Sequence, residues 1–134
     1  MLSVKNLSFA IDGKTILDDV SVDFAVGKIT AILGANGSGK STLMSFLGKN
    51  RASRGRVFFS GEDICAITPH AYALKAAMLP QQRETIADFA VEDVVVMGRF
   101  PYKRQFRDYT DADYEIARTA MRQVGIEAMA KRRI

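Results

Sequence analysis

Apolar and polar residues alternate over the first 24 positions of the chain, in two stretches. Leu2–Phe9 has the period of two that is typical of a strand, with one break in phase, and Val20–Phe24 repeats that period. After a turn at 26–28, Ile29–Leu33 is a short apolar run with one Thr, the form that a buried strand takes. The pattern predicts two half-buried strands followed by one buried strand.

Helical spacing begins directly after the glycine-rich segment that follows these strands. Ser41–Leu47 carries apolar residues at helical spacing, and Gly48 is well placed to end that helix. Arg56–Phe59 returns to the strand pattern and is closed by Ser60 and Gly61. A further short strand is expected at Ala77–Leu79.

The last third of the chain is predicted to be mainly helical. Thr68 and Pro69 form an N-cap and a first helical position, and Val91–Gly98 suits a helix although Ala90 is a poor N-cap. Thr110, with Asp113 three residues later, resembles a capping arrangement for a helix that ends near Gly125. Strands dominate the first third of the chain and helices the last third, an order that predicts an α/β fold with a helical appendage from about Val91.

Length and composition are those of one modest globular domain. The chain has 134 residues, 48% of them hydrophobic and 25% charged, and its apolar runs are far shorter than the roughly 20 residues that span a bilayer. No signal-peptide pattern is present, and the single Cys65 cannot form an internal disulfide. The net charge of +4 comes largely from 103–107 and 131–133, without the interleaved aromatic residues of a nucleic-acid site, so we expect no nucleic-acid partner.

The segment Gly34–Ser41 matches the phosphate-binding motif G-x-x-x-x-G-K-[ST] in full. Glycines permit the positive φ angles that turn successive N–H groups towards phosphate oxygens, and the following helix points its positive end at the same anion. A lysine in this position reaches the β- and γ-phosphates, and a serine hydroxyl is an oxygen ligand for Mg²⁺. The predicted nucleotide-binding residues are Gly34, Ala35, Asn36, Gly37, Ser38, Gly39, Lys40, Ser41 and Thr42.

This motif alone leaves the class of enzyme open, because kinases, GTPases and transport ATPases share it. Hydrolysis also needs a carboxylate at the end of a second apolar strand to hold Mg²⁺. The apolar runs at 57–59, 16–17 and 94–97 do not provide a convincing one.

The residues from Met1 to about Arg133 resemble the first half of the ATPase subunits of ABC transporters. The resemblance rests on Leu7–Val20 with Gly27–Gly34, on Met78–Gln81, and on Val91–Tyr102. The last segment resembles the helical subdomain of cassettes that serve ferric-siderophore, haem and cobalamin importers. The resemblance implies a truncated ABC ATPase-like P-loop NTPase core, with residues 1–90 forming the nucleotide-binding part and 91–134 the start of an α-helical subdomain.

The resemblance also implies roles for individual residues. Lys40 and Gln81 take the catalytic positions, and Ser41 and Gln81 the metal positions, with Gln82 as the alternative to Gln81. Ile11 lies where the family usually stacks an aromatic ring on adenine, and Phe9 is the alternative ring. The family's signature loop, Walker B acids and switch histidine are expected after Ile134, so we expect this chain alone to be hydrolytically inactive.

The function implied by the resemblance is the ATP-binding subunit, or a fragment of it, of an ABC importer that takes up an iron-siderophore-type substrate. Its cofactors are expected to be ATP and Mg²⁺, and its partners a second copy of the subunit in a head-to-tail dimer and an integral membrane permease. Its expected location is peripheral, at the cytoplasmic face of the plasma or inner membrane. Two alternatives stay open: another P-loop enzyme such as a small-molecule kinase, and a non-enzymatic nucleotide-binding fragment.

Overall fold

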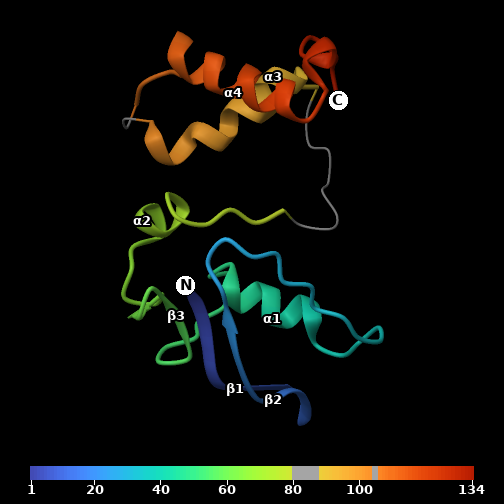
Figure 1. Cartoon of the computed structure of the whole chain (residues 1–134), viewed down its shortest axis with the longest axis vertical. Helices are drawn as coiled ribbons and strands as arrows, with labels where there is room; N and C mark the ends of the chain where they lie inside the picture. The colour runs from blue at the N-terminus through green and yellow to red at the C-terminus, as the bar shows by residue number, and fades with distance from the viewer. Residues whose placement is uncertain (80–87, 104–105) are drawn as a thin grey trace. The chain divides into compact units, whose positions relative to one another are not determined.

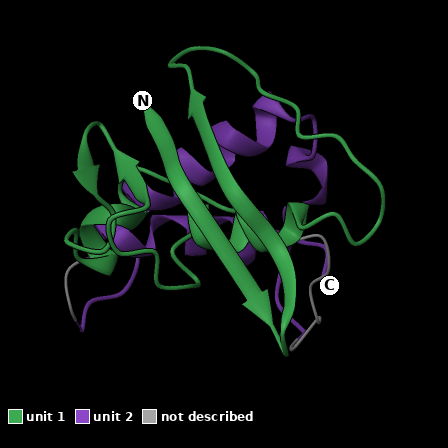
Figure 2. Cartoon of the chain, turned by 90° about the horizontal axis from the view of Figure 1, so that it is seen from below, with its two compact units in different colours: residues 1–78 green, residues 79–134 purple. Residues whose placement is uncertain are grey.

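The structure is a computed structural model that describes residues 1–79, 88–103 and 106–134 (Figure 1). The chain divides into two compact units, Met1–Met78 and Leu79–Ile134 (Figure 2). This boundary precedes the predicted boundary at residue 90, and the functional assignment of 1–90 and 91–134 stays a prediction. Each unit is described below by itself.

The first unit is built on an antiparallel sheet, which contains the strands predicted at 2–9, 20–24 and 56–59. Its strands are β1 (Leu2–Ile11), β2 (Lys14–Phe24), β3 (Val57–Phe59) and β4 (Glu62–Asp63), in the order β2-β1-β3-β4. Asp12 and Gly13 join β1 to β2 with φ angles of 48° and 76°, as a two-residue hairpin turn requires.

The break in phase along β1 is a β-bulge. The register of β1 against β2 shifts between Val4 and Leu7, and Asn6 between them has a φ of 47°. The Asn6 N–H donates to Ser21 Oγ at 2.9 Å, and its side-chain amide donates to Asp19 Oδ1 at 2.8 Å. Because the bulge adds one residue, Val4 and Leu7 are both buried although they are three positions apart.

The helix α1 (Lys40–Leu47) packs against this sheet (Figures 1 and 2). Its buried face joins sheet residues in one core, which contains Val4, Leu7, Leu17, Leu43, Phe46, Leu47, Val57, Ile64, Ile67 and Tyr72. Gly48 is its C-cap, as predicted, but the left-handed residue is Lys49, with a φ of 61°. The Lys49 ammonium donates to the carbonyls of Ile64 and Ile67, which holds this residue in place.

The short helix α2 (Pro69–Ala73) begins where the sequence predicts. Thr68 Oγ1 accepts from the N–H of Ala71 at 3.2 Å, and Pro69 occupies the first helical position. The buried Tyr72 hydroxyl donates to the carbonyl of Leu47 at 2.7 Å, which connects α2 to the end of α1.

Two predicted strands do not form. Residues 29–33 and 77–79 have no regular secondary structure, and Ile29 and Leu33 are almost fully exposed. A buried strand requires neighbouring strands that pair with its backbone and elements that cover its faces. Among the described residues, the sheet β2-β1-β3-β4 provides neither for 29–33, so apolar character alone does not make this run a strand.

The second unit consists of α3 (Val91–Val96), η1 (Met97–Tyr102), α4 (Asp111–Gln123) and η2 (Glu127–Met129). The predicted capping at Thr110 is confirmed, because its hydroxyl accepts from the Asp113 N–H at 3.3 Å and its own N–H donates to Asp113 Oδ2 at 3.0 Å. α3 and α4 lie side by side (Figure 1) and bury Val96, Ala117 and Met121.

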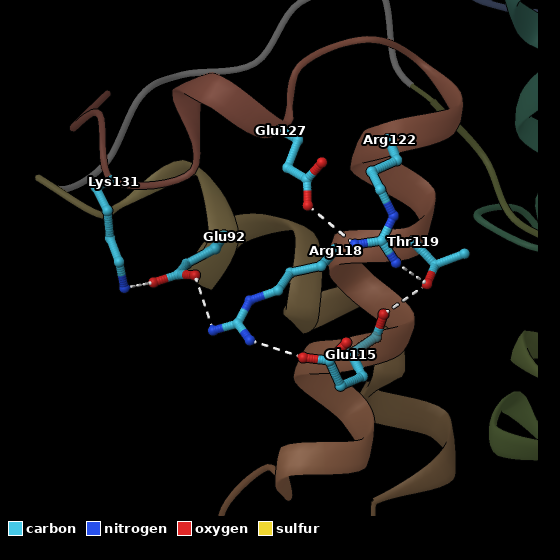
Figure 3. A network of polar contacts seen from close by, with 7 residues as sticks. All are labelled: Glu92, Glu115, Arg118, Thr119, Arg122, Glu127 and Lys131. Carbon is cyan, nitrogen blue, oxygen red and sulfur yellow. Dashed lines mark hydrogen bonds and ion pairs between the residues drawn. The ribbon is translucent and has the colours of Figure 1, made fainter.

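A buried acid joins the end of the chain to the start of α3. Glu92 accepts a hydrogen bond from Lys131, and its other oxygen lies 3.7 Å from an Arg118 nitrogen (Figure 3). The backbone N–H of Glu92 donates to Ala130 O at 3.0 Å, and that of Ile134 donates to Phe89 O at 3.0 Å. These contacts hold residues 130–134 against the segment that leads into α3. None of the helices in the described part of the chain has the length and apolar character needed to cross a bilayer.

Candidate functional site

The glycine-rich segment 34–41 forms a loop that leads directly into α1. Gly37 and Gly39 have φ angles of 80° and 87°, in the left-handed region that favours glycine. Gly39 is also the N-cap of α1. The predicted junction of glycine loop and helix is therefore present, although the residues before it are not a strand.

The loop lies against β2 so closely that Gly39 leaves no room for a side chain. A Cβ on Gly39 would lie 2.7 Å from the carbonyl oxygen of Ile16 and 2.9 Å from Leu17 Cδ2. At Gly34 the neighbour is within the loop itself, where a Cβ would lie 2.8 Å from Ser38 Oγ. Ile16 and Leu17 of β2 thus pack directly against the loop at Gly39. Sequence reasoning missed this role because the motif does not include β2.

The Lys40 ammonium is enclosed by the loop to which it belongs. Its Nζ donates to the carbonyls of Gly34 at 2.7 Å and Ala35 at 2.6 Å, and lies 3.4 Å from Ser38 Oγ. A lysine has three N–H donors, and all three have an acceptor here. The positive charge therefore points into the centre of the loop, where an anion would meet it.

The N-terminus of α1 adds further donors to the same place. The first N–H groups of a helix have no acceptor within the helix, and glycine at the N-cap offers no side chain to bind them. No acidic residue lies in the first turn of α1, so the positive end of the helix dipole is not neutralised there. The donor set of Lys40 and the helix start fits a phosphate group.

The hydroxyls predicted to bind the metal and the α-phosphate follow in the first turn. Ser41 is exposed and Thr42 is half-buried, and the Thr42 carbonyl accepts from Ser45 Oγ at 2.7 Å. Within 1–79, 88–103 and 106–134, no cluster of three or more His, Cys, Asp or Glu side chains is present. Mg²⁺ keeps several waters and shares phosphate oxygens, so a single hydroxyl fits as one of its protein ligands.

The two positions predicted for the adenine differ in their surroundings. Ile11 ends β1 beside the hairpin turn, pairs with Lys14 and is 43% exposed. The Phe9 ring packs edge-on against Phe46, with 5.2 Å between centroids, and carries the Arg51 guanidinium 4.8 Å from its centroid. The Phe9 ring is therefore already in contact with Phe46 and Arg51, whereas the Ile11 side chain is partly exposed.

The predicted Q-loop residues Gln81 and Gln82 lie outside the described residues. The segment before them follows α2, and its Met78 lies beside the residues that end α1. Met78 Sδ lies 3.7 Å from the side-chain nitrogen of Asn50, and a Cβ on Gly48 would lie 2.5 Å from the same sulfur.

The loop, the enclosed lysine and the open helix start together define a phosphate-binding loop of the P-loop class. The sequence profile of the family described as ABC transporter matches residues 17–134. The chain belongs to the ABC transporter family. This family is ATP-binding, which makes a nucleotide the ligand that the loop geometry fits.

Several relatives are named as import or transport ATP-binding proteins. The chain is 37% identical over 141 residues to the hemin import ATP-binding protein HmuV of Burkholderia pseudomallei, and 38% identical over 133 residues to the protein of the same name from Bordetella pertussis. It is 31% identical over 132 residues to the achromobactin transport ATP-binding protein CbrD of Dickeya dadantii. Each match covers 98% of this chain but only 52%, 50% and 49% of the relative, respectively. The chain thus spans about half the length of these relatives.

Solved structures agree with the family. A metal-chelate-type ABC transporter in an inward-facing conformation superimposes with a TM-score of 0.74 at 26% identity, covering 98% of this chain and 47% of that one. A nucleotide-free ATP-binding cassette from an ABC transporter gives a TM-score of 0.76 at 22% identity, covering 98% and 56%, which shows the fold alone. The predicted α/β P-loop NTPase fold and the resemblance to haem and siderophore importer cassettes are confirmed.

Proposed function

We propose that this chain is the ATP-binding part of the ATPase subunit of an ABC importer for haem or an iron-siderophore complex. One observation carries the proposal: the Lys40 ammonium is enclosed at the start of α1 in a chain of the ABC transporter family. The names of the relatives support the substrate class, because the printed names refer to hemin and to achromobactin.

We infer that ATP binds through residues 34–42. Lys40 exchanges the carbonyls of Gly34 and Ala35 for the β- and γ-phosphate oxygens, a stronger acceptor set because those oxygens are charged. The N–H groups at the start of α1 bind the same phosphates, and the Ser41 hydroxyl holds Mg²⁺. When bound, Mg²⁺ neutralises charge that develops on the phosphate oxygens. Ile11 offers an exposed apolar contact to the base.

The remaining roles belong to the whole subunit. Gln81 is proposed to approach Mg²⁺ and the attacking water, on the strength of the family resemblance. A second copy of the subunit and a membrane permease are the proposed partners, and the cytoplasmic face of the plasma or inner membrane is the proposed location. Residues 91–102, with Phe100 69% exposed, offer an apolar surface for the permease.

Isothermal titration of the chain with ATP in the presence of Mg²⁺ tests the nucleotide site. Lys40→Ala removes a charge-assisted contact of about 1.5–3 kcal/mol, so affinity should fall by roughly ten- to a hundredfold. Lys28→Ala is the matched control, because this exposed lysine precedes the loop without belonging to it. Equal affinity of the wild type and Lys40→Ala would contradict the assignment, as would an equal loss in both variants.

A further inference from the structure

A second positively charged site lies on the first unit, at the opposite end of α1 from the glycine loop. A cavity of about 350 Å³ is lined by three arginines of one loop, Arg51, Arg54 and Arg56, and by aromatic and apolar side chains that include Phe9, Phe46 and Leu7. No acidic residue lines it. The site shares no residue with 34–42, so the proposed nucleotide site does not explain it.

The three guanidinium groups have no carboxylate partner among the residues that the structure describes. None of the six ion pairs found there includes Arg51, Arg54 or Arg56. Three unpaired cations around one cavity repel one another, and a bound anion relieves this repulsion.

Two acids neighbour the lining residues, and hydrogen bonds already occupy both. Asp63, which attracts Arg54, accepts from the N–H of Gly55 at 2.7 Å and from that of Cys65 at 2.9 Å. Asp19 accepts from the Asn6 side chain at 2.8 Å, while its N–H donates to Ser8 Oγ. These donors are neutral, so both carboxylates keep their charge, and three arginines beside two carboxylates leave an excess of one positive charge.

Backbone hydrogen bonds hold the arginine loop in place at Ser53 and Arg56, while the three arginine side chains are exposed. The N–H of Arg56 donates to Ser53 O at 2.8 Å within the loop, and the N–H of Lys5 on β1 donates to Arg56 O at 2.8 Å. The buried Ser53 donates its N–H to Cys65 Sγ at 3.3 Å. A ligand would have to order only the arginine side chains, which reduces the entropic cost of binding.

Arg51 is also oriented by the floor of the cavity. Its guanidinium lies 4.8 Å from the centroid of Phe9, which in turn packs on the buried Phe46. A guanidinium held against an aromatic ring keeps N–H donors for a ligand, because the ring is not a conventional acceptor. Planar forks of this kind bind phosphate oxygens in pairs.

We propose that this arginine-lined cavity binds a phosphate or diphosphate group independently of the glycine loop. Two sources carry that chemistry, a free phosphorylated solute and the headgroup of an anionic phospholipid. The chain should therefore bind phosphate at two places, and loss of the first should leave the second intact.

The test uses the Lys40→Ala chain, in which binding of phosphate by the glycine loop is weakened. Pyrophosphate is titrated while amide resonances are followed by NMR, and shifts are expected at Ser53, Arg54 and Gly55 rather than at Gly37 and Gly39. Adding Arg51→Gln or Arg54→Gln should weaken binding by roughly ten- to a hundredfold. Arg51→Lys keeps the charge but loses the fork, and should weaken binding by a smaller factor.

Arg107→Gln is the matched control, because it removes one exposed arginine from the second unit. Cosedimentation with vesicles of phosphatidylglycerol and phosphatidylcholine, compared with phosphatidylcholine alone, distinguishes a lipid headgroup from a free solute. Binding in either assay that depends on Arg51 and Arg54 supports the proposal. It is overturned if the Lys40→Ala chain binds neither probe, or if Arg107→Gln weakens binding as much as Arg54→Gln does. Because Lys40 is already replaced, failure of the nucleotide site cannot be confused with failure of this one.

Discussion

Gly39 is the position where the glycine loop depends most directly on its contact with β2. In Gly39→Ala the new methyl would lie 2.7 Å from Ile16 O and 2.9 Å from Leu17 Cδ2, both under normal contact distance. Its φ of 87° adds strain, since a left-handed conformation costs an L-residue about 1–2 kcal/mol. Overpacking at a close contact costs about 1–3 kcal/mol more. We expect a total destabilisation of about 2–5 kcal/mol.

Gly37→Ala is the matched control within the same loop. Gly37 has a φ of 80°, but nothing lies within 4 Å of the position that its Cβ would take. The free energy of unfolding of this variant should therefore fall by only about 1–2 kcal/mol, the cost of the backbone strain. The difference between the two variants isolates the contact of the loop with Ile16 and Leu17.

The assay is urea unfolding of the wild type and both variants, followed by circular dichroism, with ATP titration of each folded protein. Gly39→Ala should unfold at the lowest urea concentration and should bind ATP more weakly, because relief of the clash requires the loop to move away from β2. Equal unfolding midpoints for Gly39→Ala and Gly37→Ala would refute the argument, since they would show that the close contact has no energetic consequence.

Two further outcomes are expected. The hydrogen bond from Lys131, together with its charge and that of Arg118, holds the pKa of Glu92 below its ordinary value against the opposing effect of burial. This stabilisation is present above the ordinary pKa of 4.5 and is lost as the pH falls through the lower folded value. Protection of the α4 amides from hydrogen exchange should therefore decrease in acid. The decrease should be smaller in Glu92→Gln, which has no carboxylate at this position to protonate. The chain alone should also show no catalytic ATP hydrolysis in a steady-state phosphate-release assay. Turnover of roughly 1 per second or more that disappears in Lys40→Ala would contradict this expectation.

Local rules were enough to predict most elements of this protein from its sequence. β1 and the second half of β2 follow from alternating side chains, whereas the start of β2 at Lys14 was not predicted. α2 and α4 follow from Thr68 and Thr110 at their caps, and the glycine loop from a motif whose residue types each have a chemical reason. Even the break in phase of β1 was visible, because the bulge at Asn6 changes the spacing of buried residues within one strand. These features depend on contacts between residues that are close in the sequence.

Tertiary structure decided the features that need a partner from elsewhere in the chain. Ile29–Leu33 has the composition of a buried strand but is not one, because burial requires neighbouring strands that the described sheet does not supply. The requirement for glycine at position 39 comes from Ile16 and Leu17, and the environment of Glu92 comes from Lys131, 39 residues later. The arginines at 51, 54 and 56 have the composition of an ordinary solvated loop, and only the fold brings Phe9 and Phe46 beneath them.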